Sequence, residues 1–378
     1  MAGKVVMFVT NDASSDPRVE KEAAALAGAG FGVTVLAWDR RGAAERVEQR
    51  GGVTYERLGP RAPYGGGPRS VALFRAYWRG AAERATDLGP DVLHCHDLDT
   101  APAGLAVQRR ATSRPGLVLD MHELYRDSNM VPQRGLMGRA ARAAVRVVER
   151  RAFRAADHIL VANPGTVDYY RLLGVGGKVV LVENAPELER FDLVVRDPAA
   201  SFTVGYFGQK RYPEGLRLLM EAIQPHAEMR AVLRGGGVAA GEVAALASGM
   251  QRVEASGVFK YAELPALYAE CDVVYAVYDV ALGNVRTLFP VKVMEAMASG
   301  LPVVVADGTW VGEYVVEHGI GVSIPAGDQE ALEAALVRLA SDPMARQEMG
   351  ARGRAIIESG LNWDASSARL LEVYARWR

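Results

Sequence analysis

The chain has 378 residues, which is long for one domain and suits two. Hydrophobic residues make up 49% and charged residues 24%, so the chain can bury full cores and should be globular. The formal net charge of −1 argues against nucleic acid as the main partner.

The cysteines and the hydropathy pattern indicate an intracellular protein. Cys95 and Cys271 lie far apart within apolar runs, so no disulfide framework is expected and a reducing cytoplasm fits. Cys95 lies between His94 and His96, but no second group of ligands is evident, so we expect no metal. The N-terminus shows no signal-peptide pattern, and no apolar run approaches the roughly 20 residues of a membrane span.

Short apolar strands alternate with longer helical patterns from end to end, which predicts parallel sheets joined by right-handed crossovers. The strands expected in a first sheet are Val5–Thr10, Val33–Trp38, Val92–His96, Leu117–Met121, Ile159–Ala162 and Val179–Glu183. The strands expected in a second sheet are Phe202–Phe207, Ala231–Gly235, Val273–Val277, Pro302–Ala306 and Gly321–Ile324. The clearest helices between them are Asp16–Ala29, Arg139–Ala155, Gly215–Gln224, Ala262–Ala269 and Asp328–Ser341.

The pattern breaks near Pro186–Ser201, a stretch with weak periodicity. We therefore expect an α/β protein of two doubly wound, Rossmann-like domains, residues 1–190 and 198–361, with a C-terminal helix over 362–378 that packs back on the first domain. Two such domains would leave a ligand cleft between the C-terminal ends of their strands.

The glycines at 28–32, Gly28-Ala-Gly-Phe-Gly32, imitate a dinucleotide fingerprint. They follow the first helix and precede the second strand, whereas the fingerprint lies between the first strand and the first helix. We interpret them as a helix end and a turn, which weakens a dehydrogenase interpretation.

The stretch 289–307 predicts a helix, a glycine stop and a buried strand. Pro290 suits the first turn of that helix. Lys292 and Glu295 share one stripe of it, so the Lys and the helix start can hold phosphate while the Glu holds two ribose hydroxyls. An ordinary surface Lys–Glu pair has the same spacing, and spacing alone leaves both interpretations open.

Seven segments carry a resemblance that covers nearly the whole chain. They are Asn11…Asp16-Pro-Arg-Val-Glu-Lys-Glu22, His94-Cys-His-Asp97, Asp120-Met-His-Glu-Leu-Tyr125, Val182-Glu-Asn-Ala-Pro186, Gly257…Asp272, Pro290-Val-Lys-Val-Met-Glu-Ala-Met-Ala-Ser-Gly300 and Trp363…Tyr374. In this order the chain resembles the retaining glycosyltransferases with the GT-B fold, usually assigned to family four. Two positions depart from that family: Thr287 replaces the first glutamate of the donor motif, and Glu214 stands where a basic residue is common.

The resemblance implies transfer of a sugar from a nucleotide diphosphate, most readily a UDP-sugar, to an acceptor hydroxyl with the anomeric configuration kept. It implies no metal cofactor. The catalytic residues would be His122, Glu295 and Lys292. Donor-binding residues would be Lys210, Arg211, Gly208, Gly235, Gly236, Thr287, Pro290 and Val291. Acceptor-binding residues would be Asp16, Arg18, His96 and Asp97.

Several of these roles have a structural alternative. Asp16 is equally suited to be a helix N-cap. His96 and Asp97 can line the cleft or serve the fold, and Lys210 and Arg211 can be ordinary loop charges. The resemblance implies front-face attack, with the leaving phosphate oxygen taking the acceptor proton. No carboxylate of the chain is an evident covalent nucleophile.

Other functions remain in view. Asp97-Leu-Asp99 imitates a metal motif of the other glycosyltransferase fold, but a two-domain pattern argues against that fold. A sugar-nucleotide epimerase would need acid–base carboxylates in the cleft, and no clear set exists. An inactive partner subunit or a sugar-nucleotide sensor would fit the missing first glutamate.

The segment Arg134–Arg154 is strongly basic, with seven Arg and one Glu. Arg139, Arg142, Arg146 and Arg150 form one stripe, with alanine and valine opposite. Such a helix can lie on an anionic membrane at the inner face, or it can be the solvated face of a packed helix.

Overall fold

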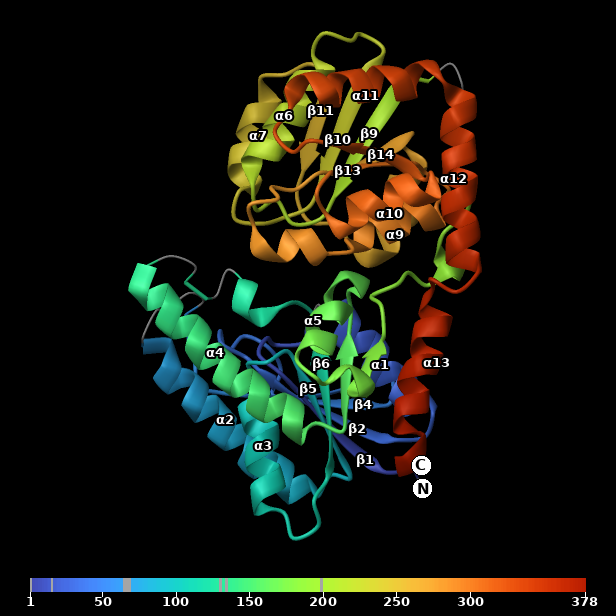
Figure 1. Ribbon diagram of the computed structural model, residues 1–378. Coiled ribbons are helices and arrows are strands. Elements are labelled where there is room, and N and C mark those ends of the chain that lie inside the picture. Colours follow the sequence, from blue (N-terminus) through green and yellow to red (C-terminus); the bar gives the residue numbers. More distant parts are fainter. Residues whose placement is uncertain (1, 15, 64–68, 129–130, 133–134, 198–199) are drawn as a thin grey trace. The chain divides into compact units, whose positions relative to one another are not determined.

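The computed structural model describes all residues except 1, 15, 64–68, 129–130, 133–134 and 198–199. The chain folds into two compact units, each built on its own sheet (Figure 1). Unit 1 comprises Met1–Asn184 and Ser366–Arg378, and unit 2 comprises Ala185–Ala365. Among the described residues, no helix combines the length and the apolar character needed to cross a bilayer.

Unit 1 holds an eight-stranded sheet in the order β3-β4-β2-β1-β5-β6-β7-β8. Its strands are β1 (Lys4–Val9), β2 (Gly32–Trp38), β3 (Val47–Arg50), β4 (Val53–Leu58), β5 (Val92–His96), β6 (Gly116–Met121), β7 (His158–Val161) and β8 (Val179–Leu181). All neighbours pair in parallel except β3, which runs antiparallel to β4. Parallel pairing puts the carboxyl ends of β1, β5 and β6 at one edge of the sheet.

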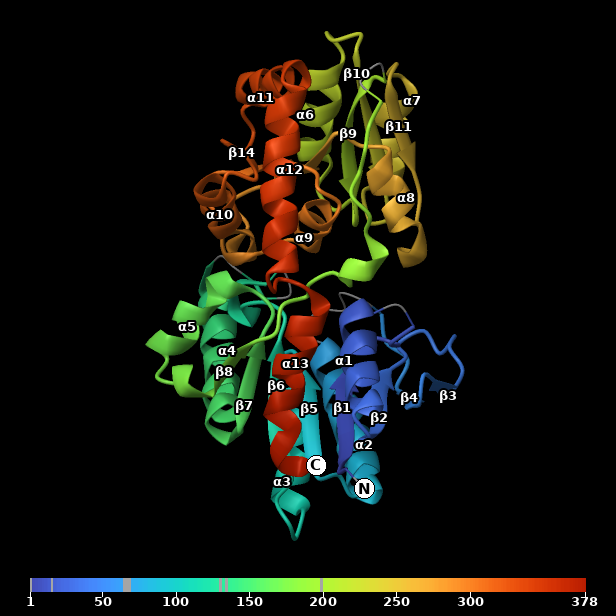
Figure 2. The same cartoon turned by 90° about the vertical axis from the view of Figure 1, so that its right-hand side faces the viewer.

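Helices cover both faces of this sheet. One face carries α2 (Arg69–Leu88), α3 (Ala101–Arg110) and α4 (Gly135–Ala155), and the other carries α1 (Pro17–Gly28) and part of α13 (Trp363–Tyr374), as Figures 1 and 2 show. The short α5 (Val167–Leu172) lies between β7 and β8.

The two faces of the sheet differ in polarity. Leu93, Cys95 and Leu119 alternate into an apolar core with residues of α2, α3 and α4. The intervening residues, among them His94 and Asp120, therefore point to the face covered by α1 and α13. That second layer holds buried charges instead of a purely apolar core.

Unit 2 holds a six-stranded parallel sheet in the order β11-β10-β9-β12-β13-β14. Its strands are β9 (Phe202–Phe207), β10 (Met229–Arg234), β11 (Val253–Ser256), β12 (Val273–Ala276), β13 (Val303–Ala306) and β14 (Gly321–Ile324). Its helices are α6 (Pro213–Ile223), α7 (Ala240–Ser248), α8 (Leu264–Ala269), α9 (Val291–Ala298), α10 (Trp310–His318), α11 (Gln329–Ser341) and α12 (Pro343–Glu358). One core joins the sheet to α6, α7 and α11, and a second joins the opposite face to α8, α9, α10 and α12.

The expected fold class, two doubly wound α/β domains, is confirmed. Three strands, β3, β4 and β11, were not expected, because polar residues interrupt each of them. The glycines at 28–32 do form a helix end and a turn, because α1 stops at Gly28 and Gly30 has a φ of 92°. The expectation for Pro290 is wrong by one residue: its ψ of 132° is extended, so it is the N-cap and Val291 begins α9.

Candidate active site

His122 lies just beyond the carboxyl end of β6, between two carboxylates. Its Nδ1 is 3.2 Å from Oδ2 of Asp97, and its Nε2 is 2.8 Å from Oδ2 of Asp120. Burial alone would lower the pKa of this imidazole, but the two carboxylates outweigh burial and raise it to about 10. His122 is therefore an imidazolium at neutral pH, with both ring nitrogens occupied.

Asp97 holds His122 from a strained backbone position at the end of β5. Its φ of 60° lies in the left-handed region, which is uncommon for a residue other than glycine. Its amide donates to the carbonyl of Asp120 at 2.8 Å, and its Oδ1 accepts from the amide of His122 at 3.1 Å. Strain of this kind gathers at functional sites, where the surrounding bonds hold it in place.

Asp120 is anchored from behind by Arg18 of α1. The guanidinium donates from Nε to Oδ2 at 2.8 Å and from Nη2 to Oδ1 at 2.5 Å, while Nη1 donates to the carbonyl of Val182 at 2.9 Å. Burial would raise the pKa of Asp120, but the charges of Arg18 and His122 hold it well below its ordinary value. Arg18 was expected to meet an acceptor or the diphosphate, whereas in the structure it is buried and turned inward.

The same buried layer continues to the C-terminal helix. Nη2 of Arg18 is 2.9 Å from Oε1 of Glu22, and Oε2 of Glu22 is 3.3 Å from Nε2 of His94. Nδ1 of His94 then meets the hydroxyl of Tyr374 at 2.7 Å. One continuous polar network therefore joins α13, β5, α1 and β6.

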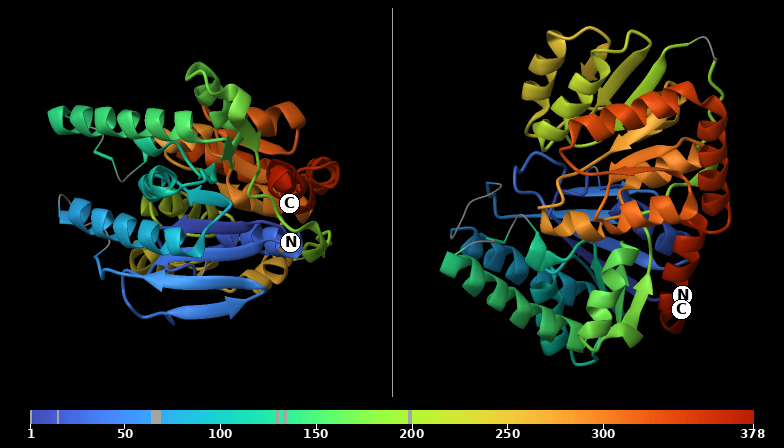
Figure 3. Two further views of the ribbon diagram at one scale, coloured as in Figure 1. Left: turned by 90° about the horizontal axis from the view of Figure 1, so that it is seen from below. Right: turned by 45° about the horizontal axis from the view of Figure 1, so that its top comes forward.

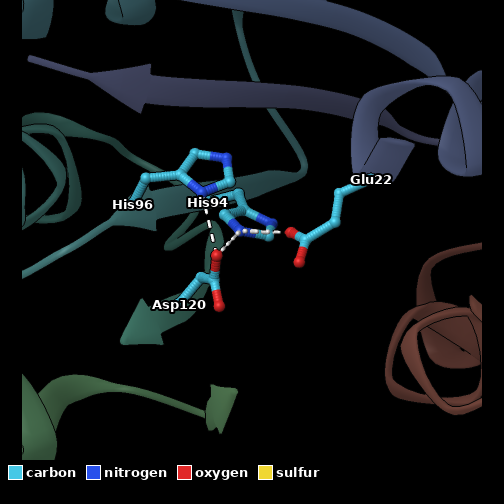
Figure 4. Close-up of side chains that lie close together, drawn as sticks. All are labelled: Glu22, His94, His96 and Asp120. Atoms are coloured by element: carbon cyan, nitrogen blue, oxygen red, sulfur yellow. Dashed lines mark hydrogen bonds and ion pairs between the residues drawn. The ribbon is translucent and has the colours of Figure 1, made fainter. Parts of the chain in front are cut away.

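Four members of this network, Glu22, His94, His96 and Asp120, bring ligand atoms within 4.8 Å of one another (Figure 4). That spacing would suit a metal ion. However, Arg18 pairs with both carboxylates of the group, so a fixed cation already offsets part of their charge. The arrangement fits a buried ion-pair network better than a metal centre.

Two of the residues expected to bind the acceptor substrate, Asp16 and His96, have structural roles. Oδ1 of Asp16 accepts from the amide of Val19 at 3.3 Å, so Asp16 is the N-cap of α1, as its structural alternative predicted. His96 is buried, and its Nδ1 is 2.9 Å from Oδ2 of Asp120. Asp97 remains partly exposed beside His122.

In unit 2, Lys292 and Glu295 lie in the first two turns of α9, and both are buried. The hydroxyl of Tyr268, from α8, donates to Oε2 of Glu295 at 2.8 Å and approaches the carbonyl of Lys292 at 3.3 Å. This is not the surface ion pair that spacing alone allowed. The carboxylate is fixed by a tyrosine beneath it.

The ammonium of Lys292 lies over aromatic rings beside the β9 loop. Nζ is 3.6 Å from the ring centre of Tyr206 and 5.3 Å from that of Tyr278. A Cβ added to Gly208 would come within 3.4 Å of the same atom. Burial lowers the pKa of Lys292 to about 7, although Glu295 acts in the opposite direction.

The glycine loops after β9 and β10 pack against each other. Gly208 has a φ of 133° and Gly235 a φ of 134°, and a Cβ on Gly235 would collide with the carbonyl of Gly208. The amide of Lys210 donates to the carbonyl of Gly236 at 2.7 Å. The glycines allow a close approach of these two loops.

The remaining expected donor residues differ in exposure. Lys210 is only 1% exposed, and its Nζ donates to the carbonyl of Ser256 at 2.5 Å, so it faces inward. Arg211 beside it is exposed. Thr287 ends a short 3-10 turn (Gly283–Thr287) and is half-buried, as is Val291.

Tyr268, Asp120 and Tyr374 have roles in the structure that were not expected from the sequence. Asp120 carried a signal that could have been used, because a carboxylate within an otherwise apolar strand must find a partner. Tyr268 and Tyr374 carried none, since buried tyrosines are common in cores.

Two family models match the chain, one for each sheet. Residues 15–185 match a glycosyl transferase 4-like domain, and residues 201–342 match the glycosyl transferases group 1. The fold and these matches define a glycosyltransferase enzyme of the GT-B class. The chain belongs to the group 1 glycosyltransferases of the family-four type.

Similar proteins include two synthases and a protein solved with UDP-glucose. The glycogen synthase of Mycobacterium tuberculosis is 24% identical over 295 residues, which cover 75% of this chain and 68% of that protein. The sucrose-phosphate synthase of Thermosynechococcus elongatus has a TM-score of 0.76 at 20% identity, over 99% of this chain and 98% of that one. Anabaena HepE, solved in complex with UDP-glucose, has a TM-score of 0.72 at 16% identity, over 99% and 100%. At these sequence identities the similarity to the solved structures supports the fold alone.

Proposed function

We propose that the protein is a retaining glycosyltransferase that moves a sugar from a nucleotide-diphosphate sugar to an acceptor hydroxyl. The acceptor would be a glycan, a lipid-linked intermediate or a small metabolite. The observation that carries the donor assignment is the buried Lys292 and Glu295 pair on α9, with Glu295 held by Tyr268.

The donor is best taken as a UDP-sugar. Anabaena HepE was solved with UDP-glucose. A relative from Corynebacterium glutamicum that is 32% identical over 80 residues, 21% of each chain, is instead named as GDP-mannose-dependent. The experiment below therefore compares donors that differ in their nucleobase.

Lys292 would neutralise the diphosphate. A buried ammonium near the start of α9 is already in position to stabilise the negative charge of the leaving phosphate. The surrounding groups then need to reorganise little during the reaction. Glu295 would accept hydrogen bonds from the ribose hydroxyls through its carboxylate, which Tyr268 holds in place. Arg211, exposed on the loop after β9, would add charge without a metal ion.

The chemical step would break the bond between the anomeric carbon and the phosphate oxygen. A bond from the acceptor oxygen to the same face of that carbon would form, and the acceptor proton would pass to the leaving phosphate oxygen. His122 would act as a fixed positive charge, because both its ring nitrogens are already bound to Asp97 and Asp120. We place the reaction in the cytoplasm, with peripheral contact at the inner face of the membrane.

The test is thermal unfolding against UDP-, GDP-, dTDP- and ADP-sugars, for the parent protein, Glu295→Ala and the control Glu242→Ala. Glu242 is exposed on α7. A ligand that binds the folded state raises the melting temperature. We expect a rise with UDP-sugars that Glu295→Ala loses and Glu242→Ala keeps. The anomeric configuration of the product, read by NMR, then tests retention. No rise with any nucleotide sugar would reject the donor site.

A further inference from the structure

We propose that the outward face of α4 is a docking surface for an anionic lipid bilayer. This rests on the proposed function only in that a lipid-borne acceptor would be met there. Lipid binding itself can be measured without any donor or acceptor.

The outward face of α4 carries an apolar line. Leu136 is 80% exposed and Val147 is 48% exposed, with Ala140 and Ala143 exposed between them. These four are spaced by four, three and four residues, so they follow one another along a single side of the helix. Met137, 77% exposed, lies beside the start of this line.

Arginines flank the apolar line. Arg139, Arg146 and Arg150 are exposed along one side of it, and Arg151 is exposed on the other. The single acidic residue of α4, Glu149, is buried and accepts from the hydroxyl of Tyr169 at 3.0 Å. Every charged residue on the outward face of α4 is therefore an arginine.

The inward face of α4 does not need these apolar residues. Gly138, Ala152 and Phe153 are buried against the unit, while Arg142 is half-buried and reaches the carbonyl of Pro132 at 3.4 Å. Alanine and valine were expected opposite the arginines, and the structure places Ala152 there, whereas Ala140 and Val147 lie on the exposed side. Arg134, the first arginine of the basic segment, lies outside the described residues.

The positive charge and the exposed position of α4 together favour a membrane as the partner of this face. Figures 1 and 3 show the N-terminal half of α4, where Leu136 and Met137 lie, extending beyond the strands of the sheet. An apolar line can enter the boundary between headgroups and acyl chains while flanking arginines meet anionic headgroups. A nucleic acid would match the arginines but would leave the apolar line without a partner.

The test is cosedimentation of the full chain with vesicles of phosphatidylcholine alone and with added phosphatidylglycerol, at low and high salt. We expect binding only to the anionic vesicles and a decrease with salt. The triple variant Arg139→Glu, Arg146→Glu and Arg150→Glu should weaken it by about a hundredfold. The pair Leu136→Ser and Met137→Ser should weaken the binding that remains at high salt.

A matched triple variant controls for net charge. The control variant carries Arg109→Glu, Arg110→Glu and Arg338→Glu, which reverse three exposed arginines outside α4. It changes the net charge by the same amount and should bind vesicles nearly as well as the parent. Equal loss in both triple variants, absence of binding at low salt, or a preference for duplex DNA over vesicles would overturn the proposal. Thermal shifts with nucleotide sugars on the same variants should be unchanged, which separates this proposal from the donor assignment.

Discussion

The guanidinium of Arg18 and the carboxylate of Asp120 meet through two parallel hydrogen bonds inside the layer between the sheet and α1. These residues are 102 positions apart, and their pairing fixes α1 against the end of β6. Asp120 in turn holds His122. The geometry of the partly exposed imidazole thus depends on a buried arginine.

Arg18→Met should destabilise unit 1 strongly, because it leaves Asp120 and Glu22 buried without their cation. We expect the free energy of unfolding to fall by about 3–5 kcal/mol. Urea unfolding followed by fluorescence measures it, with the exposed Arg109→Met as control. Arg18→Lys should lose part of this amount, since an ammonium cannot reproduce the bidentate geometry. A loss below about 1 kcal/mol, the size typical of an exposed pair, would contradict a buried network.

His122 should remain protonated well above neutral pH. Asp97 and Asp120 raise its pKa to about 10, against about 6.5 in the unfolded chain. The resulting stability is fully present below about pH 6.5 and is lost as the pH rises through about 10. NMR of 15N-labelled histidine, with His122→Asn for assignment, should show an imidazolium at about pH 9.

The partner variant tests the cause of that shift. Asp97→Asn removes one of the two facing charges and should lower the pKa of His122 by about one unit or more. Asp168→Asn, at an exposed ion pair with Arg171, should leave it unchanged. A parent His122 that titrates near its ordinary value would show that the carboxylates do not control it.

Local patterns predicted most of the fold. The central strands of both sheets are apolar runs that end in polar or glycine residues. A glycine with a φ of 71° follows the C-cap of α9. Such features can be recognised within a short window of sequence. The strands β3 and β11 were not predicted because their residues alternate between half-buried and exposed. Their sequences therefore contain few apolar residues.

The site was predictable only where a motif was local. Lys292 and Glu295 are one helical turn apart, and their pairing on α9 could be inferred. The contact between Tyr374 and His94 joins residues 280 positions apart. The contact between Arg18 and Asp120 joins α1 to β6 across 102 positions. The hydrophobic periodicity of a segment cannot predict such distant partners, because the topology of the sheet decides which segments meet.

Gly235→Ala should disturb the donor loops. The residue has a φ of 134°, and an added Cβ would collide with the carbonyl of Gly208. We expect a loss of stability of about 1–3 kcal/mol and weaker nucleotide binding, measured by thermal unfolding with and without a nucleotide sugar. Gly241→Ala, in open space on α7, should instead be neutral or stabilising by up to about 1 kcal/mol. Equal behaviour of the two variants would show that the loops can separate at little cost.

Tyr268→Phe should weaken donor binding by releasing one oxygen of Glu295. Losing a buried hydrogen bond to a charged group costs about 1.5–3 kcal/mol, or about tenfold or more in affinity. Calorimetric titration with the nucleotide sugar found by thermal shift measures it. Tyr275→Phe removes a comparable hydroxyl, one that donates to the carbonyl of Gly215 at 2.9 Å, and should leave affinity largely intact. If both variants bind as the parent does, Tyr268 does not orient Glu295.

Donor affinity should fall as the pH rises through the pKa of Lys292. Burial lowers that pKa to about 7 in the free protein. A diphosphate binds the ammonium form and raises the pKa in the complex, so binding takes up a proton above about pH 7. The dissociation constant should be level below that pH and rise up to about tenfold per pH unit above it. Nucleotide sugars suit the measurement, because their diphosphate diester does not titrate in this range.

Two variants separate Lys292 from every other titrating group. Lys292→Met should bind weakly at all pH values and lose the pH dependence. Glu295→Gln should move the decline to lower pH, because the carboxylate is what favours the ammonium against burial. Calorimetry in buffers of different ionisation enthalpy counts the protons directly. An affinity of the parent protein that stays level from about pH 6 to about pH 9, with no proton uptake, would mean that Lys292 does not meet the diphosphate.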